Sequence, residues 1–462
     1  MSKYEKYKAS GIDWIGVVPK HWKRKRFRYC FDNGKGLSIT KENLIETGIP
    51  CVNYGEIHSK YGFIVDPEKD ELLCVDEKYL ETNQSSLLSN GHFVFADTSE
   101  DIEGSGNFTH LIGNHKIFAG YHTIVSRLKI NAHPRYVAYF FDSVAYRNQI
   151  RSEVQGVKVF SITNKILKDT ILFFPEFTEQ LSIANYLDHQ TQKIDRLISN
   201  KKAQAEKLKE LRQIEINNAV TKGLPAEAAV KAGLDPNIEM KDSGIEWMGE
   251  IPEHWQSLRL KHISSVRGRI GFRGYTTEDL VEETEGAITI GATHITSNGL
   301  IDLSAPIYIS WNKYYESPEI MVELGDLIIV QRGSTVGKVG VVITDFGKST
   351  INPSVVLIRP NKRIDTQYLF FYIISDLISK TVSLLTSSTA IPMISQEQIE
   401  NFEILLPPIS EQQRIVEYLK AKTEAIDKLI KNISTQIEKL QELRKIKIYE
   451  AVTGKINVNE YA

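Results

Sequence analysis

The stretch Ser10-Gly11-Ile12-Asp13-Trp14-Ile15-Gly16, followed by Pro19 and His21-Trp22, recurs in the second half of the chain as Ser243-Gly244-Ile245-Glu246-Trp247-Met248-Gly249, followed by Pro252 and His254-Trp255. A second set of repeats closes each half. The dipeptides Glu179-Gln180, Ile194-Asp195 and Leu211-Arg212 return as Glu411-Gln412, Ile426-Asp427 and Leu443-Arg444. Between these segments the two halves share little identity. Solenoid repeats have periods of about 20–50 residues, so the pattern indicates a duplicated module in which a constant frame surrounds variable contents.

Each half ends in a long helical pattern. Apolar residues recur every seven positions at Leu187 and Ile194 in the first half, and at Leu419, Ile426 and Ile433 in the second. No proline or glycine interrupts 179–221 or 411–453, and charged residues fill the outer positions. The repeat predicts two long helices with a coiled-coil seam. Because neither helix could bury its apolar stripe alone, we expect the two to pair, antiparallel if a pseudo-twofold axis relates the halves.

The segments inside the frames predict mixed β-sheet with short helices. Runs rich in β-branched residues at 286–290, 327–330, 339–343 and 355–358 are typical of strands, and 136–150 and 368–377 are typical of helices. We therefore predict an α/β (α+β) fold of two mixed domains separated by two long antiparallel coiled-coil helices, with pseudo-twofold internal duplication. The expected boundaries are 1–175 for the first domain, 176–222 for the first long helix, 223–242 for a linker, 243–407 for the second domain and 408–454 for the second long helix.

Composition excludes several classes of protein. The chain is 42% hydrophobic and 25% charged with a net charge of −2, which is typical of globular domains. Its longest apolar runs fall far short of the roughly 18–20 residues that cross a bilayer, so we expect a cytoplasmic protein without a membrane partner. Cys30, Cys51 and Cys74 are too few and too widely spaced for a disulfide framework or a zinc site, and we expect unpaired thiols.

Local charge points to nucleic acid. The basic run at 20–28 contains Lys20, Lys23, Arg24, Lys25, Arg26 and Arg28 without an acidic residue. Such runs are often only solvated surface, but clustered Lys and Arg also neutralise the phosphates of a nucleic acid. A sparser set follows the second frame, at Arg259, Lys261, His262, Arg267, Arg269 and Arg273.

Catalytic motifs are weak. Gly333 to Lys338 has three residues between its glycines and Val339 after the lysine, so it departs from the phosphate loop, which has four residues and a Ser or Thr. Asp66, Asp76 and Lys78 faintly resemble a nuclease metal site, and a magnesium-dependent nuclease remains an alternative. Asn352-Pro353-Ser354 falls short of an adenine methyltransferase signature. We therefore predict a chain with no catalytic residues, no metal ligands and no bound cofactor.

The repeated frames resemble the specificity (S) subunit of type I restriction–modification systems. The resemblance lies in Gly244 to Trp255, in its echo at 11–22, and in Glu411-Gln412-Gln413-Arg414-Ile415 at the start of a helix that ends with Ala451-Val452-Thr453-Gly454. It covers the whole chain, with small departures such as Val17-Val18-Pro19-Lys20 against Glu250-Ile251-Pro252-Glu253.

The resemblance implies a non-catalytic, sequence-specific DNA-recognition subunit with two target-recognition domains, each of which reads one part of a bipartite sequence in double-stranded DNA. The long helices would dock the modification (methyltransferase) subunits, two in number, and restriction subunits would complete the complex. S-adenosylmethionine, ATP and Mg are implied for those partner subunits. A coiled-coil adaptor that binds proteins stays open as an alternative.

Candidate DNA contacts come from aligning the two halves. Gly34-Lys35 aligns with Gly268-Arg269, and the loop 97–107 aligns with 331–338. Loops of this kind offer Arg to guanine, and Asn or Gln to adenine. The expected contacts in the first half are Lys23, Arg24, Arg26, Lys35, Ser38, Thr40, Asp97, Thr98, Ser99, Tyr121 and His122. Those in the second half are Arg267, Arg269, Arg273, Gln331, Arg332, Ser334, Thr335 and Lys338.

Overall fold

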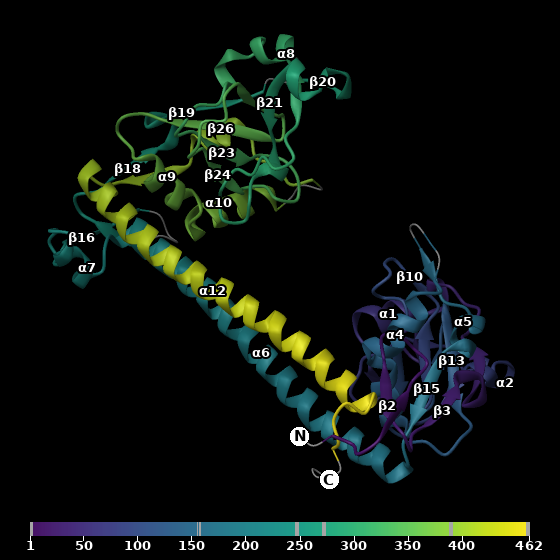
Figure 1. The fold of residues 1–462 in the computed structure, drawn as a ribbon. Helices are drawn as coiled ribbons and strands as arrows, with labels where there is room; N and C mark the ends of the chain where they lie inside the picture. The colour runs from purple at the N-terminus through teal and green to yellow at the C-terminus, as the bar shows by residue number, and fades with distance from the viewer. Residues whose placement is uncertain are drawn as a thin grey trace. The chain divides into compact units, whose positions relative to one another are not determined.

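The computed structural model describes residues 3–154, 156, 159–244, 249–269, 274–387 and 391–458 (Figure 1). The chain divides into two compact units. Unit 1 comprises Met1–Lys202 with Ser434–Ala462, and unit 2 comprises Ala203–Ile433. Each unit therefore contains one globular domain together with one end of each long helix.

Unit 1 is built on two sheets. The larger has the strand order β4 (Phe31–Lys35), β13 (Thr123–Leu128), β9 (Phe93–Ala96), β11 (Phe108–Leu111) and β6 (Ile64–Val65). The smaller has the order β7 (Cys74–Val75), β5 (Ile49–Val52), β12 (Ile117–Ala119) and β8 (Leu87–Leu88). Strand β13 runs antiparallel to both β4 and β9, whereas β12 and β5 are parallel. The short helices are α1 (Tyr54–Ser59), α2 (Tyr79–Thr82), α3 (Pro134–Asp142), α4 (Val144–Arg151) and α5 (Asn164–Asp169).

Unit 2 repeats this plan. One sheet has the order β19 (Ser264–Gly268), β26 (Val355–Pro360), β23 (Leu327–Val330) and β24 (Val339–Val341). The other has the order β20 (Leu280–Val281), β22 (Tyr308–Ser310), β21 (Gly286–Ile290) and β25 (Ser349–Ile351), in which β21 and β25 are parallel. The short helices are α7 (Ala226–Lys231), α8 (Trp311–Tyr315), α9 (Thr366–Ile373), α10 (Asp376–Thr386) and α11 (Gln396–Glu400).

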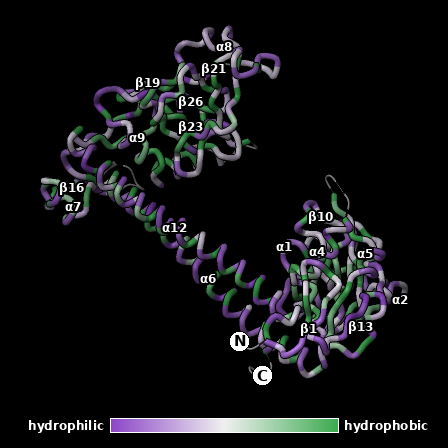
Figure 2. Tube along the Cα trace, in the orientation of Figure 1, coloured by the Kyte–Doolittle hydropathy of each residue, from purple (hydrophilic) through white to green (hydrophobic). Residues whose placement is uncertain are grey.

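Aromatic side chains form the main core of unit 1. Phe93, Phe95 and Phe108 on the larger sheet pack against Phe141 of α3, with ring centroids 5.0–5.6 Å apart. Burying a phenylalanine side chain contributes roughly 1.5–3 kcal/mol, so this cluster fixes α3 on the sheet. Figure 2 shows hydrophobic residues concentrated in the strands of each unit, while hydrophilic and hydrophobic residues alternate along the long helices.

The repeated frames form small two-stranded sheets. In unit 1, β1 (Tyr7–Ala9) pairs with β2 (Val17–Pro19), and β3 (Lys23–Arg26) pairs with β15 (Ile171–Phe174). In unit 2 the same pairs are β16 (Met240–Asp242) with β17 (Glu250–Pro252), and β18 (Gln256–Arg259) with β27 (Glu403–Leu406). Because β16 pairs with β17, the end of the expected linker 223–242 belongs to the second frame.

The two long helices are α6 (Phe177–Lys222) and α12 (Ile409–Val452), which confirms the helices expected at 179–221 and 411–453. In unit 1, Arg444 Nε donates to Asp195 Oδ1 over 3.1 Å. In unit 2, Arg212 Nε donates to Asp427 Oδ1 over 3.0 Å, and Tyr418 donates to Glu215. From Arg212 to Glu215 along α6, the contacted residue on α12 moves back from Asp427 to Tyr418. The two helices therefore run antiparallel in unit 2.

The segments 136–150 and 368–377 are helical as expected, with one feature that the sequence did not indicate. Each is two helices, α3 followed by α4 and α9 followed by α10, broken at Ser143 and at Ser375. The Ser143 hydroxyl accepts a hydrogen bond from Tyr146 N at 3.2 Å and so caps a new helix. The apolar period continues across the break, and periodicity alone therefore does not reveal it.

Cys30, Cys51 and Cys74 are buried and unpaired, which confirms the expectation of free thiols. Burial raises the pKa of the Cys30 thiol to about 11. Among the described residues no single helix is long and apolar enough to cross a membrane, although α9 and α10 taken together, bent by 53°, would match by length and composition. Both of these helices contribute to the hydrophobic core of unit 2.

Candidate nucleic-acid interface

Four segments of unit 1 meet around one cavity of about 510 Å³, which we call edge 1. They are the end of β4 with the loop after it, the residue that follows β9, the turn before β13, and the segment before α5. The expected DNA contacts Lys35, Ser38, Asp97, Tyr121 and His122 all line this cavity. The structure thus brings together five residues that are far apart in the sequence.

Backbone hydrogen bonds hold edge 1 together. Asp97 N donates to His122 O at 3.0 Å, and Ile162 N donates to Asp97 O at 2.7 Å. Gly36 lies against the same turn, where a Cβ atom would stand 1.9 Å from Gly120 O, so only glycine fits there. Hydrogen bonds thus hold both the backbone N–H and the backbone carbonyl of Asp97, so its side chain projects from a fixed backbone position.

The polar side chains of edge 1 form a small cluster. The Asp97 carboxylate accepts from Thr98 Oγ1 at 2.7 Å and lies 3.3 Å from His122 Nδ1. Tyr54 packs its ring edge to face with Tyr121 and His122, at centroid distances of 5.6 and 5.3 Å. His122 has a φ of 55°, a left-handed conformation that costs free energy in a residue other than glycine and often marks a functional site.

Unit 2 builds an equivalent edge 2 from the end of β19, the residue that follows β23, the turn before β26 and the segment at the start of α11. Gln331 N donates to Ser354 O and Ile394 N donates to Gln331 O, each at 2.9 Å, which are the bonds that Asp97 makes in unit 1. Gly268 at the end of β19 matches Lys35 at the end of β4, since Gly268 pairs with Val356 and Lys35 with Ile124, each the second residue of the neighbouring strand, β26 or β13. The structure therefore confirms the alignment of the loop 97–107 with 331–338. The expected alignment of Gly34-Lys35 with Gly268-Arg269 is wrong by one residue, because the strand register places Lys35 at the position of Gly268.

The side chains differ between the edges although the backbone bonds match. Gln331 stands in the place of Asp97, and its Nε2 donates to Pro353 O at 2.9 Å. The turn Tyr121-His122 of edge 1 is Pro353-Ser354 in edge 2. Edges 1 and 2 thus share a scaffold and present different donors and acceptors.

The glycine-rich stretch Gly333 to Lys338 is the hairpin between β23 and β24, as its departure from the phosphate-loop spacing indicated. Gly333 and Gly337 have φ values of 108° and 86°, which a tight turn of this kind requires. Arg332, Ser334 and Thr335 are exposed beside edge 2. Lys338 lies apart from them and lines a cavity of unit 2.

Two expected contacts are not supported, because their side chains are buried. Arg269 donates to Ile351 O and to Thr350 Oγ1, each at 3.2 Å, and its guanidinium lies over the ring of Tyr275. Burial also lowers the pKa of Arg269. Ser99 is buried under the loop that follows β10 (Thr98–Ser99), the strand paired with β14 (Phe160–Ser161). Arg273 lies outside the described residues.

The basic run is a separate patch of unit 1. It lies on β3 in the frame, at the opposite end of the unit from β10 (Figure 1). Lys23 forms an ion pair with Glu176 at 3.0 Å, whereas Arg24 and Arg26 form no ion pair among the described residues. The structure thus does not bring the basic run and edge 1 together.

The exposed Thr40 begins a short turn after edge 1, where its backbone N donates to Asn43 Oδ1.

The acids of the nuclease alternative belong to local turns. Asp66 accepts from Lys69 Nζ at 2.7 Å, and Asp76 accepts from Lys78 N at 2.9 Å. These hydrogen bonds lower the pKa of both carboxyl groups. Across the part of the chain that the structure describes, no group of three or more His, Cys, Asp or Glu could hold a metal ion.

Sequence reasoning missed the contributions of Tyr54 and of the segments before α5 and α11. The side chain of Gln396 accepts from Gly268 N at 3.1 Å, and Asn33 Nδ2 donates to Asn164 Oδ1 at 2.9 Å. Both segments have a helix-capping signal, because Thr163 and Ser395 precede short helices and accept hydrogen bonds from their first turns. That signal predicts a helix start but not its position beside the sheet.

Comparison with known proteins gives one consistent family. The type I restriction modification DNA specificity domain matches residues 252–439. The MjaVIII type I restriction enzyme specificity subunit of Methanocaldococcus jannaschii is 26% identical over 326 residues, which cover 69% of this chain and 70% of that protein. The putative MjaX specificity subunit of the same organism is 24% identical over 96% of each chain.

Solved structures share the fold. A chain from the structure that describes complex assembly and conformational transition of the type I R-M system aligns with a TM-score of 0.68 and 17% identity, over 95% of this chain and 99% of that one. The HsdS subunit from Thermoanaerobacter tengcongensis aligns with a TM-score of 0.50 and 18% identity, over 95% and 98%. Nothing in these similarities supports the nuclease alternative. Residues 252–439 thus match a type I restriction modification DNA specificity domain, and over nearly its whole length the chain is similar to specificity subunits of type I restriction–modification systems.

Proposed function

We propose that edge 1 and edge 2 each read one part of a bipartite DNA sequence. The observation that carries this proposal is that the two edges share the same backbone hydrogen bonds but carry different side chains. Asp97 and Gln331 occupy the same position, held by the same two backbone hydrogen bonds. A scaffold that fixes the backbone and varies the side chain is suited to two different base sequences.

The side chains favour particular base contacts. A carboxylate accepts from the amino group of cytosine in the major groove, whereas Arg pairs with guanine and Gln with adenine. Asp97 therefore suits an amino-bearing base in the first half-site. Gln331, Arg267 and Arg332 suit purines in the second. The exposed cations of the basic run suit phosphates, which carry no sequence information.

We further propose that α6 and α12 dock two modification subunits. Three apolar side chains of unit 1, Leu197, Leu443 and Ile446, are 39–43% exposed, and their equivalents in unit 2, Leu429, Leu211 and Ile214, are 43–53% exposed. We call these sets triad 1 and triad 2. Single exposed apolar residues are ordinary, but the same three positions recur in both units. Two copies of one partner fit this repetition.

In this proposal the partner subunits carry the chemistry. The modification subunits would bind S-adenosylmethionine and transfer its methyl group, and restriction subunits would use ATP and Mg for translocation and cleavage. Assembly with DNA places the complex in the cytoplasm. This chain would supply recognition and the helices on which the other subunits assemble.

The test is methylation mapping of the host genome with and without the gene for this chain. A split motif whose methylation disappears on deletion supports the proposal. Unchanged methylation, or absence of DNA retention when this chain is assembled with its modification subunits, would instead favour a protein-binding adaptor.

A further inference from the structure

A chain of polar contacts in unit 1 links the loop after β10 to the long helices. Asn107 accepts a hydrogen bond from Arg147, and Arg147 Nη2 donates to Asp142 Oδ1 at 3.1 Å. Arg444 of α12 donates through Nη1 to Asp142 Oδ2 and through Nε to Asp195 Oδ1, each at 3.1 Å. The two guanidinium groups are balanced by two carboxylates, with Asp142 between them.

The equivalent positions in unit 2 have different residues. Asn107 precedes β11 as Lys338 precedes β24, and Asp142 and Arg147 flank Ser143 as Ile374 and Ser379 flank Ser375. Arg444 and its partner Asp195 correspond to Arg212 and Asp427, which make the same ion pair at 3.0 Å. The equivalents of the four linked residues of unit 1 are therefore Lys338, Ile374, Ser379 and Arg212.

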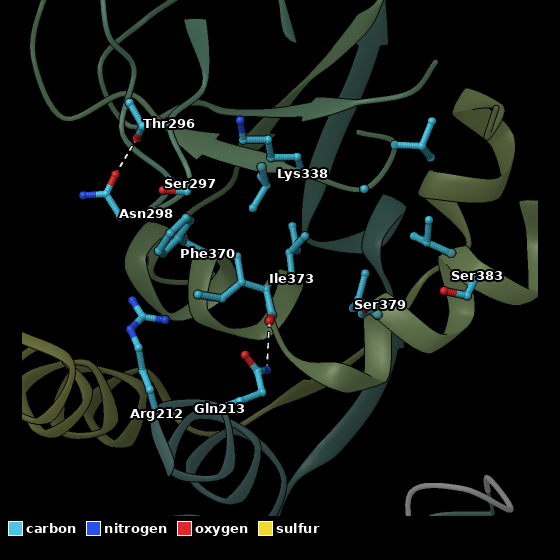
Figure 3. A pocket seen from close by; sticks show the side chains of 17 residues that line it. Arg212, Gln213, Thr296, Ser297, Asn298, Lys338, Phe370, Ile373, Ser379 and Ser383 are labelled. Atoms are coloured by element: carbon cyan, nitrogen blue, oxygen red, sulfur yellow. Dashed lines mark hydrogen bonds between the residues drawn. The ribbon is translucent and has the colours of Figure 1, made fainter. Parts of the chain in front are cut away.

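All four of these residues line one cavity of about 380 Å³ in unit 2 (Figure 3). The carboxylate of Asp142 has no counterpart there, because Ile374 takes its place. Arg212 keeps the contact of Nε with Asp427, but its terminal nitrogens have no carboxylate corresponding to Asp142 among the described residues. Lys338 forms no ion pair within the described ranges. Unit 1 has two cations against two anions at this place, and unit 2 has two cations against one.

We propose that this cavity of unit 2 binds an oxyanion, a phosphate or carboxylate group, which supplies the negative charge that Asp142 supplies in unit 1. Arg212 and Lys338 supply the charge, and an Arg side chain matches the geometry of phosphate and carboxylate oxygens. Ser379 and Ser383 of α10 offer hydroxyl donors on another wall (Figure 3). The site is independent of the proposed DNA-reading edges.

The rest of the lining indicates a ligand larger than a bare ion. Phe370 and Ile373 of α9 and Val382 of α10 form an apolar wall, and the ring of Phe370 lies between the labelled side chains of Arg212 and Lys338 in Figure 3. An aromatic side chain can stack on a flat ring of a ligand. The apolar wall would then favour a ring-bearing phosphate such as adenosine monophosphate over inorganic phosphate.

The test is isothermal titration of the full chain at low ionic strength with inorganic phosphate, acetate and adenosine monophosphate. We expect saturable binding of one anion per chain. Lys338→Asn, which installs the residue of unit 1, should weaken binding by about 10- to 100-fold. Lys348→Asn, which removes an exposed lysine of the same unit outside the cavity, is the matched control and should leave the affinity unchanged.

A second variant places a carboxylate of the chain itself in the cavity. Ile374→Asp combined with Ser379→Arg transplants the pair of unit 1, keeps the charges balanced, and should abolish binding. The absence of saturable binding of all three probes to the unmodified chain, or an equal effect of Lys338→Asn and Lys348→Asn, would overturn the proposal. Loss of the signal on saturation with target duplex would assign these cations to the DNA interface and would overturn it as well.

Discussion

The indole Nε1 of Trp22 donates a hydrogen bond of 3.0 Å to Oε1 of Glu179, and the equivalent Trp255 donates one of 3.1 Å to Glu411. His21 and His254 lie 2.9 and 2.8 Å from the second carboxylate oxygens. The two sequence repeats of each half therefore contact one another in space. The His-Trp pair that ends the first repeated stretch of each half binds the glutamate in the first turn of each long helix, and this contact joins each domain to its helix.

Replacing Glu179 with Ala should destabilise unit 1. The carboxylate is buried and accepts hydrogen bonds from Tyr4 and Trp22 as well as facing His21, so its removal leaves buried donors without an acceptor. We expect a loss of about 2–4 kcal/mol in the free energy of unfolding of this unit. Glu179→Gln keeps one oxygen acceptor and should cost less. Thermal unfolding of the two variants measures the difference, and equal midpoints for Glu179→Ala and the unmodified chain would contradict the expectation.

The sequence predicts much of the fold because the duplication and the heptad repeat are local and periodic. The strands expected at 286–290 and 327–330 coincide with β21 and β23, and both long helices agree with expectation within two residues at each end. The breaks at Ser143 and Ser375 could not be predicted in this way, since a serine within an apolar helical pattern is compatible with an uninterrupted helix.

The candidate site was predictable only in part. Lys35, Asp97 and His122 line edge 1, and Asp97 matches Gln331 as the alignment of the halves indicates. Arg269 appears equally suited in the sequence, but residues more than eighty positions away, Thr350 and Ile351, hold it in the interior. Lys338 likewise belongs to a cavity that α6 and α10 complete. Contacts of this kind depend on tertiary packing, which a single sequence does not display.

Asp97→Asn should alter the first half-site at one position and leave the second half-site unchanged. The substitution replaces a pure acceptor by a group that also donates, and a base contact of this type is worth about 1–3 kcal/mol of discrimination. The matched change in unit 2 is Gln331→Glu, which should alter only the second half-site. Methylation mapping of both variants checks this expectation. A change in both half-sites from either variant would contradict it.

Serine at all three positions of triad 1 should remove one modification subunit from the complex, and serine at triad 2 should remove the other. Each triad is exposed in the isolated chain, so the substitutions should leave thermal stability nearly unchanged. Native mass spectrometry of the assembled complex counts the subunits. Retention of both modification subunits by the triad 1 variant would show that the helices dock them elsewhere.

Neutralising Lys23, Arg24 and Arg26 should weaken binding to all DNA sequences alike. Each phosphate contact contributes roughly one unit to the slope of log affinity against log salt, so the slope should fall by up to about three units. Because Lys23 is already paired with Glu176, we expect its contribution to the slope to be the smallest of the three. Affinities for target and non-target duplexes across a salt series provide the measurement. An altered base preference with an unchanged slope would identify these residues as base readers.

The central claim is that each unit reads its own half-site, and exchange of the interior of unit 2 tests it most directly. Residues 257–392 can be replaced by the equivalent segment of a related specificity subunit while Trp255 and Glu411 are kept, so that the frame contact of unit 2 survives. Genome-wide methylation mapping of the chimaera should then show a new second half-site beside the original first half-site. Methylation with both half-sites changed, or with the first changed and the second retained, would contradict the account.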